Sequence, residues 1–266
     1  MSVLIVIPAR YASSRYPGKP LAMLKGATGI EKSLIQRSWE AAMAVRGVDQ
    51  VVIATDDSRI ADEANSFGAE VVDTPSTCEN GTARCAAALE ALKNPFEIVV
   101  NLQGDAPLTP PWFVEDLISR LQREPEFDVA TPVLNCHGAA LEAFREDRRH
   151  GRVGATTAVF DRHWRALYFS KEVIPYTTET YESADSTPVW HHVGVYAYRP
   201  KALRAYRDMS AGPLERLEGL EQLRFLEAGQ SILCVAVTAR GRNFWELNNP
   251  EDSLRIEHAL AKLDIE

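Results

Sequence analysis

Residues 3–20 read VLIVIPARYASSRYPGKP, and the interpretation of the whole chain starts from this stretch. Its first five residues form an uninterrupted apolar run, which is typical of a strand buried on both faces of a parallel sheet. Directly after that run the chain gathers three cations, Arg10, Arg15 and Lys19, on a loop shaped by two prolines and Gly18. We therefore expect an α/β protein whose first strand opens onto a cationic loop.

The next eighty residues alternate between strand-like and helix-like patterns. Apolar strand patterns recur three times, at 51–55, 69–73 and 97–102. Amphipathic helical patterns fill the intervals, at 30–45, 58–68 and 82–92. Asp57 or Ser58 is the expected cap of the second helix and Thr82 that of the third. This rhythm predicts an open, mostly parallel sheet with helices on both faces.

The second half of the chain has a different pattern. Strand-like segments with longer connections are expected at 128–134, 154–161, 166–171, 190–199 and 231–237. A single long helix is expected over 213–229, where leucines recur every three residues and predict a core-facing stripe, and a closing helix over 250–263. The sheet is therefore expected to become mixed, with a smaller, strand-rich part in this half.

Composition excludes several classes of function. The chain has 266 residues, a formal net charge of −8 and a pI of about 5.4, so it has no general attraction for nucleic acid or anionic membranes. The first apolar run is too short for a signal peptide or a membrane span, and no later run is long enough to cross a bilayer. Four cysteines without CxxC or zinc spacing predict reduced, mostly buried thiols in a cytoplasmic protein.

The cationic loop has the residues that a polyphosphate requires. In open α/β sheets ligands bind beyond the carboxyl ends of the strands, and this loop leaves the first such end. Two guanidinium groups and an ammonium suit phosphate oxygens, while Gly18 permits a close approach of the backbone. The alternative is a solvated basic loop. The stretch is neither a Walker A motif, because GKP lacks the upstream glycine and the following hydroxyl, nor a GxGxxG motif.

A carboxylate follows the fourth predicted strand in the stretch VVNLQGDAPL. Asp105 there is a natural ligand for Mg²⁺ bound next to a phosphate-binding loop. The alternative is an aspartate that caps a helix or closes a turn. Cations and Mg²⁺ acting on one triphosphate define a nucleotidyl-transfer site, where positioning and charge neutralisation at phosphorus do most of the catalysis.

Two adjacent pairs in the second half are also candidates for a site. His191 and His192 on a strand would place one ring on each face, although a single buried and hydrogen-bonded histidine is the commoner case. Glu221 and Gln222 interrupt the leucine pattern, so at least one of them could face a cleft, although most such pairs are solvated.

The stretches IPARYASSRYPGKPL and NLQGDAPL together resemble the CMP-Kdo synthetases, which activate 3-deoxy-manno-octulosonate (Kdo) with CTP. The resemblance continues through VVIATDD, ENGTARCAAAL, HHVGVYAYR, PLERLEGLEQLRFLEAG and NNPEDSLRIEHAL, in the family's order. It implies a Rossmann-like sheet of the nucleotide-diphospho-sugar transferase type, transfer of CMP from CTP to the anomeric hydroxyl of Kdo for lipopolysaccharide biosynthesis, Mg²⁺ as cofactor, and a homodimer.

The resemblance also implies how one domain over 1–266 is divided. Residues 1–135 would be mainly nucleotide-binding, 136–235 mainly sugar-binding and dimer-forming, and 236–266 would return to the metal site. The residues expected to hold the CTP phosphates or line the nucleotide pocket are Arg10, Arg15, Lys19, Gly81, Thr82 and Arg84, with Asp105 on the metal. Those expected to hold the sugar acid are Gln103, Lys171, His192, Tyr196, Glu221 and Gln222.

The sequence departs from the family pattern at four places. Ala106 replaces the usual glutamate of QGDEP, and Asn248 stands where the closing motif usually supplies a second carboxylate to the metal. Lys171 stands where arginine is common, and KGATGIEKSLIQRSWEAA replaces the usual opening of the first long helix. These changes leave open a transferase for another 2-keto-3-deoxy sugar acid or an amino analogue, and a non-catalytic nucleotide-sugar-binding homologue.

Overall fold

Strand β1 (Val3–Pro8) lies inside a large mixed sheet, between β4 (Gln50–Thr55) and β6 (Ile98–Leu102), and pairs with both in parallel. The computed structural model describes residues 2–12, 16–152, 155–242, 246–247 and 249–266. β5 (Glu70–Asp73) adds in parallel to β4 and forms one end of the sheet. All five residues predicted to begin the first strand are almost fully buried, because helices cover both faces.

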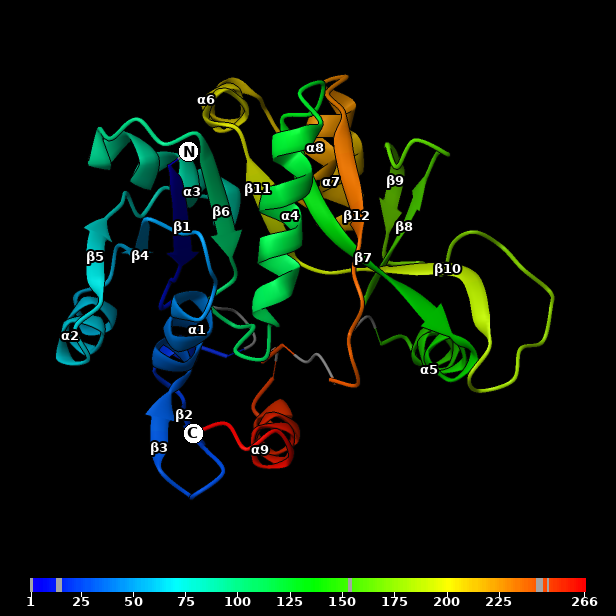
Figure 1. Cartoon of the computed structure of the whole chain (residues 1–266), viewed down its shortest axis with the longest axis horizontal. Helices are drawn as coiled ribbons and strands as arrows, with labels where there is room; N and C mark the ends of the chain where they lie inside the picture. The colour runs from blue at the N-terminus through cyan, green and yellow to red at the C-terminus, as the bar shows by residue number, and fades with distance from the viewer. Residues whose placement is uncertain (1, 13–15, 153–154, 243–245, 248) are drawn as a thin grey trace.

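The second half of the chain extends the same sheet with antiparallel strands (Figure 1). The order is β5-β4-β1-β6-β11-β7-β10-β8-β9, with β12 pairing in parallel to β7. The added strands are β7 (Val129–His137), β8 (Thr156–Phe160), β9 (Ala166–Ser170), β10 (Ser186–His192), β11 (Val195–Tyr198) and β12 (Ile232–Ala236). The expected mixed sheet is therefore confirmed.

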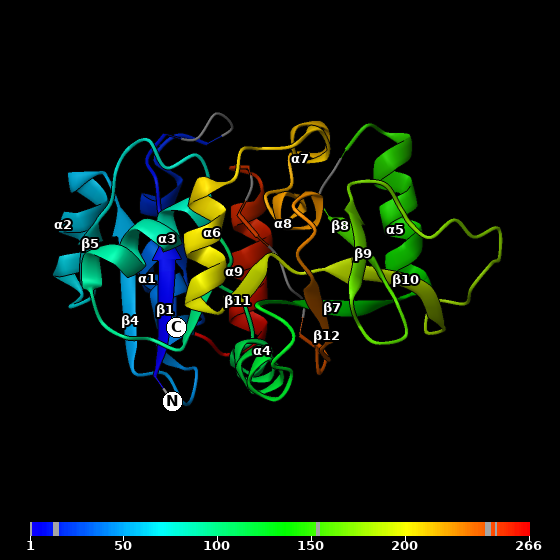
Figure 2. The ribbon, with the colours of Figure 1, turned by 90° about the horizontal axis from the view of Figure 1, so that it is seen from above.

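Helices cover both faces of the sheet (Figure 2), and each face has its own apolar core between the helices and the strands. One face carries α1 (Leu34–Met43), α2 (Ser58–Ser66) and α4 (Pro111–Arg123). The other carries α3 (Gly81–Leu92), α6 (Pro200–Asp208) and α8 (Leu223–Glu227). The short helix η1 (Lys19–Leu21) follows the cationic loop, and α7 (Pro213–Glu218) precedes α8.

Two smaller units complete the fold. The hairpin β2 (Met23–Lys25) and β3 (Glu31–Ser33) packs with α9 (Asp252–Lys262) through a third apolar cluster, so the last helix lies against residues 23–33. α5 (Gly138–Arg149) covers β10 in the second half. None of the helices in the described ranges is long and apolar enough to cross a bilayer. The four cysteines are free thiols, three of them buried, as predicted.

The single helix expected over 213–229 is wrong. The structure has two short helices, because Gly219 adopts φ 62°, a left-handed conformation that ends α7 and that glycine adopts without a steric penalty. The leucine stripe is not continuous core either, since Leu217 is 82% exposed while Leu223 is fully buried. The break places residues 220–222 in a turn between two helices.

Three further boundaries differ from expectation. The first long helix begins at Leu34 with Ser33 as its cap, because the residues before it pair in the β2–β3 hairpin. The third helix is capped by Asn80, whose Oδ1 accepts from the backbone of Ala83, and Thr82 is not its cap. The strand expected over 190–199 is two strands, β10 and β11, separated at 193–194.

Candidate active site

The loops that follow β1 and β6 meet at one edge of the sheet, because the two strands are parallel neighbours. Lys19 from the first loop and Asp105 from the second form an ion pair, with 2.6 Å between Nζ and Oδ2. The side chains are 15% and 25% exposed, so the pair is accessible to a ligand while partly shielded from bulk water. The structure thus joins the two predicted phosphate and metal elements.

The backbone around Lys19 is fixed by Tyr11. The amide of Gly18 donates to the carbonyl of Tyr11 at 2.9 Å, and Gly18 has φ 71°. Glycine suits this positive φ, and a Cβ on Gly18 would lie 3.1 Å from the Tyr11 ring, which would have to shift to make room. Arg59 stacks on the same ring, 3.3 Å from its centroid. The backbone at Gly18, next to Lys19, is therefore held by contacts within the chain.

The other two cations of the loop are less closely defined. Arg10 is exposed at the end of β1, and within the described ranges it forms no ion pair. Arg15 lies outside the described residues.

The closing segment of the chain returns to Asp105. The backbone amide of Leu247 donates to the carbonyl of Asp105 at 2.9 Å. Glu246 is near Gln103, since a Cβ on Gly194 would lie 3.3 Å from Glu246 Oε1 and 4.0 Å from Gln103 Cγ. Asn248, the predicted second metal ligand, lies outside the described residues. In the described part of the chain no three His, Cys, Asp or Glu side chains gather as a ready metal site.

The amino end of α3 forms the next part of the site. The backbone amide of Thr82 donates to Glu221 at 3.1 Å, and Gln103 donates to the same carboxylate at 3.5 Å. Burial raises the pKa of Glu221, and the hydrogen bonds from Thr82 partly offset that rise. Gly81 leaves space here, since a Cβ on it would lie 3.2 Å from the Gln103 amide. Four predicted residues from three elements are therefore brought together.

Arg84 points away from this group. Its guanidinium is buried and bonds Asp56 at 2.9 Å and the Thr74 hydroxyl at 2.7 Å. These contacts tie α3 to the carboxyl ends of β4 and β5.

Tyr196, Gln222 and His192 lie on the α3 and α8 face of the sheet. Burial raises the pKa of Tyr196, so the phenol stays protonated and donates to Gln222 Oε1 at 3.0 Å. His192 stacks edge-on against Phe169 and is hydrogen-bonded on both ring nitrogens. Burial lowers the pKa of His192 to about 3, so its ring is neutral at physiological pH. It is held by the threonine hydroxyls of Thr131 and Thr156, each at 3.0 Å.

Lys171 extends from the end of β9 toward the turn between α7 and α8. Its Nζ lies 3.0 Å from the position of a Cβ on Gly219. Glu218 holds this strand end by accepting from Ser170 Oγ at 2.7 Å and from the Lys171 amide at 2.8 Å. Glu218 was not predicted from the sequence as a site residue. The only signal for it there is its place three residues before Glu221 in a glutamate-rich stretch.

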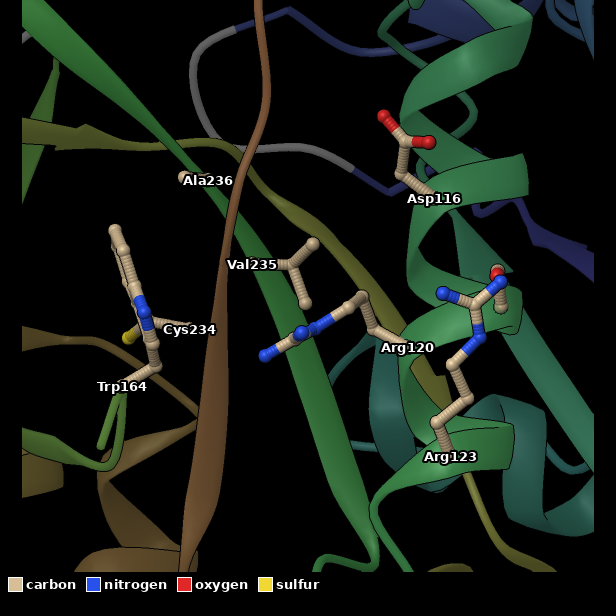
Figure 3. A pocket seen from close by; sticks show the side chains of 8 residues that line it. Asp116, Arg120, Arg123, Trp164, Cys234, Val235 and Ala236 are labelled. Atoms are coloured by element: carbon tan, nitrogen blue, oxygen red, sulfur yellow. The ribbon is translucent and has the colours of Figure 1, made fainter.

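A depression of about 430 Å³ lies elsewhere, between α4 and β12 (Figure 3). Arg120 extends into it from α4 toward Val235 of β12, with Trp164 on the opposite side, while Arg123 lies alongside α4. None of the predicted site residues lines it. The chemistry of the strand ends therefore defines the candidate site, and this depression does not belong to it.

A mixed α/β sheet that places a lysine and a carboxylate at adjacent strand ends has the arrangement expected of a nucleotidyltransferase. The family model described as cytidylyltransferase matches residues 4–232, and this chain belongs to the cytidylyltransferase family.

Relatives of the chain are known in sequence and in structure. It is 43% identical to the 3-deoxy-manno-octulosonate cytidylyltransferase of Maricaulis maris, over 98% of each chain. It is 41% identical to the 8-amino-3,8-dideoxy-manno-octulosonate cytidylyltransferase of Shewanella frigidimarina, over 98% of this chain and 99% of that one. A solved CMP:2-keto-3-deoxy-manno-octonic acid synthetase complexed with CTP matches with a TM-score of 0.83 and 32% identity, covering 99% of this chain and 100% of that one.

Proposed function

We propose that this chain transfers the cytidylyl group of CTP to the anomeric hydroxyl of Kdo. The anomeric oxygen of Kdo bonds to the α-phosphorus of CTP and loses its proton to the medium, while the bond between the α-phosphorus and the oxygen shared with the β-phosphate breaks. The products are CMP-Kdo and pyrophosphate. The observation that carries the proposal is the Lys19–Asp105 pair at the sheet edge, adjacent through Gln103 to a cluster of hydrogen-bonding side chains.

The cationic loop is assigned to the phosphates. Lys19, Arg10 and Arg15 stabilise negative charge that moves onto the leaving pyrophosphate, and groups placed beforehand act most strongly. The shaped backbone at Gly18 and Tyr11 meets this requirement for Lys19.

The residues present fit Mg²⁺. A cation, the Lys19 ammonium, already lies on Asp105 Oδ2, and Mg²⁺ commonly needs only one or two carboxylates with phosphate and water oxygens as its other ligands. Asp105 would hold the ion, with Asn248 or Glu246 as candidates for a further ligand. Bound there, the ion would neutralise charge on the triphosphate.

The cluster of polar side chains is assigned to the sugar acid. Gln103, Glu221 and Gln222 supply amide and carboxylate groups, Tyr196 orients Gln222, and Lys171 suits an acidic group. His192 acts from behind Tyr196 as a neutral support, because both of its ring nitrogens already have partners. Gly81 and Thr82, at the start of α3, lie between this cluster and the nucleotide. Arg84 holds α3 in place through its bonds to Asp56 and Thr74.

A second candidate substrate is the 8-amino analogue of Kdo. The Shewanella frigidimarina relative is named for that sugar, and its identity to this chain is nearly that of the Maricaulis maris relative named for Kdo. The test is pyrophosphate release with each of the four NTPs and with Kdo, 8-amino-3,8-dideoxy-manno-octulosonate and other 2-keto-3-deoxy sugar acids. We expect turnover with CTP and Kdo. Turnover only with the amino sugar would reassign the substrate, and none with any pair would make the chain a non-catalytic binding protein.

The setting follows from the same proposal. CMP-Kdo would serve lipopolysaccharide synthesis, the enzyme would work in the cytoplasm where CTP is formed, and it would act as a homodimer through its second half. Sedimentation of the purified chain with and without CTP tests the dimer.

A further inference from the structure

Asn101 is a buried polar residue inside an apolar strand. It lies in β6, whose five residues are all buried, and its own side chain is 0% exposed. Within the described ranges neither its Oδ1 nor its Nδ2 has a hydrogen-bond partner. An unpaired buried polar group costs about 1–3 kcal/mol, so an asparagine in this state requires a reason.

The position of Asn101 places it in the candidate site. β6 and β11 pair with Asn101 opposite Tyr196, and paired residues point to the same face of a sheet. Tyr196 donates to Gln222, whose Nε2 is a second buried group without a partner in the described structure. Asn101 Nδ2 lies 3.2 Å from the position of a Cβ on Gly81, so the glycine leaves room for it at the start of α3.

The unpaired atoms define what would complement them. Asn101 offers donors and an acceptor, and Gln222 offers donors. A hydroxyl both donates and accepts, and a primary amide can bind two neighbouring hydroxyls at once. We propose that Asn101, together with Gln222, recognises neighbouring hydroxyls of the sugar acid and determines which sugar is accepted. This inference rests on the proposed function.

Gln103 is a neighbour of Asn101. A Cβ on Gly81 would meet both amides at 3.2 Å, so Gln103 lies beside Asn101, and it is held to Glu221 by one hydrogen bond of 3.5 Å. A bond of that length is weak and opposes movement of the Gln103 side chain little. In the proposed complex Gln103 moves aside and the sugar gives Asn101 its partners.

Asn101→Leu and Asn101→Ala test the proposal through the KM for Kdo, the KM for CTP and the melting temperature. Because the variants remove unpaired groups, we expect at least one to melt at or above the wild-type temperature. In that variant the KM for Kdo should rise about 10- to 100-fold with the KM for CTP unchanged. Kdo analogues that each lack one hydroxyl give a second comparison. The wild type should have a KM for one of these analogues that is higher than its KM for Kdo by a similar factor, and the variant should not distinguish the two.

Asn135→Leu is the matched control. Asn135 is also a strand asparagine, but its Nδ2 donates to the Thr187 carbonyl at 2.8 Å and its Oδ1 accepts from Ser186 Oγ. Its replacement should lower the melting temperature and leave the KM for Kdo unchanged. An active wild type whose Asn101 variants keep the wild-type KM for Kdo, or lose stability with both KM values rising together, overturns the assignment of Asn101 alone. A wild type that releases no pyrophosphate with any sugar acid overturns the proposed function and this assignment together.

Discussion

Replacing Lys19 with alanine separates catalysis from stability. Lys19 and Asp105 are 2.6 Å apart and 15% and 25% exposed, and ion pairs open to water contribute at most about 1 kcal/mol to stability. With about 2.1 cal/mol/K of unfolding entropy per residue, a chain of 266 residues has about 0.56 kcal/mol/K, so the melting temperature should fall by no more than about 2 °C. Loss of a charge-stabilising donor should lower kcat by about 10²–10³, which is about 2.7–4 kcal/mol of the barrier.

The chain supplies a matched control for this variant. Lys32 and Glu40 form a similar ion pair, with 2.8 Å between Nζ and Oε1 and exposures of 19% and 32%, but from β3 and α1. Lys32→Ala should change the melting temperature as little as Lys19→Ala and leave kcat unchanged. The assay is pyrophosphate release at saturating CTP, Mg²⁺ and Kdo, with thermal denaturation in parallel. A folded Lys19→Ala enzyme with wild-type kcat, or an equal loss in Lys32→Ala, would refute the assignment.

Four further changes have defined outcomes. Asp105→Asn should raise the Mg²⁺ concentration for half-maximal rate and lower the rate, because a charged oxygen ligand is lost; an unchanged Mg²⁺ titration contradicts this. Asn248→Asp should lower the Mg²⁺ concentration for half-maximal rate. A variant with the wild-type dependence on Mg²⁺ would count against residue 248 as a metal ligand. Arg224→Met should lower the free energy of unfolding, measured by urea denaturation, by about 3–5 kcal/mol, because the buried carboxylate of Glu215 loses its two 2.7 Å hydrogen bonds from Arg224. Adding Glu215→Leu should restore most of that free energy. An Arg224→Met variant as stable as the wild type would refute this prediction. Because the pKa of His192 is about 3 in the folded chain against about 6.5 unfolded, only the unfolded state gains this proton as the pH falls below about 6.5. The free energy of unfolding should therefore fall by up to about 1.4 kcal/mol per pH unit between pH 6.5 and 3, and less steeply in His192→Gln; equal slopes would disprove the role of burial.

Most of the first half of the fold could be predicted because its signals are local. The apolar run of β1 needs cover on both faces, and Asp57 caps α2 by accepting from a neighbouring backbone amide, as expected. The second half was less predictable. The leucine spacing over 213–229 is that of one helix, yet the left-handed conformation of Gly219 ends α7, and no periodicity in the sequence reports a backbone angle.

Part of the candidate site was equally local. Lys19 and Asp105 could be paired from sequence because each follows a strand of the same parallel sheet, and such strands end at one edge. The roles of the remaining side chains depended on distant partners. The sequence allowed His192 to be either a residue that binds the sugar or a buried, hydrogen-bonded core histidine. The structure decides this, because Thr131 and Thr156 on neighbouring strands give both ring nitrogens a partner.

The sheet class, the cationic loop and the carboxylate opposite it could be predicted from the sequence, since each is encoded within a few consecutive residues. The side chains that surround the Lys19–Asp105 pair are brought together by the tertiary fold. The contact of Thr82 with Glu221 spans 139 residues, and the unpaired state of Asn101 exists only when β11 and α3 close around it. Contacts between residues far apart along the chain depend on how the strands are ordered and how the helices pack, and a linear pattern of residue types does not contain that information.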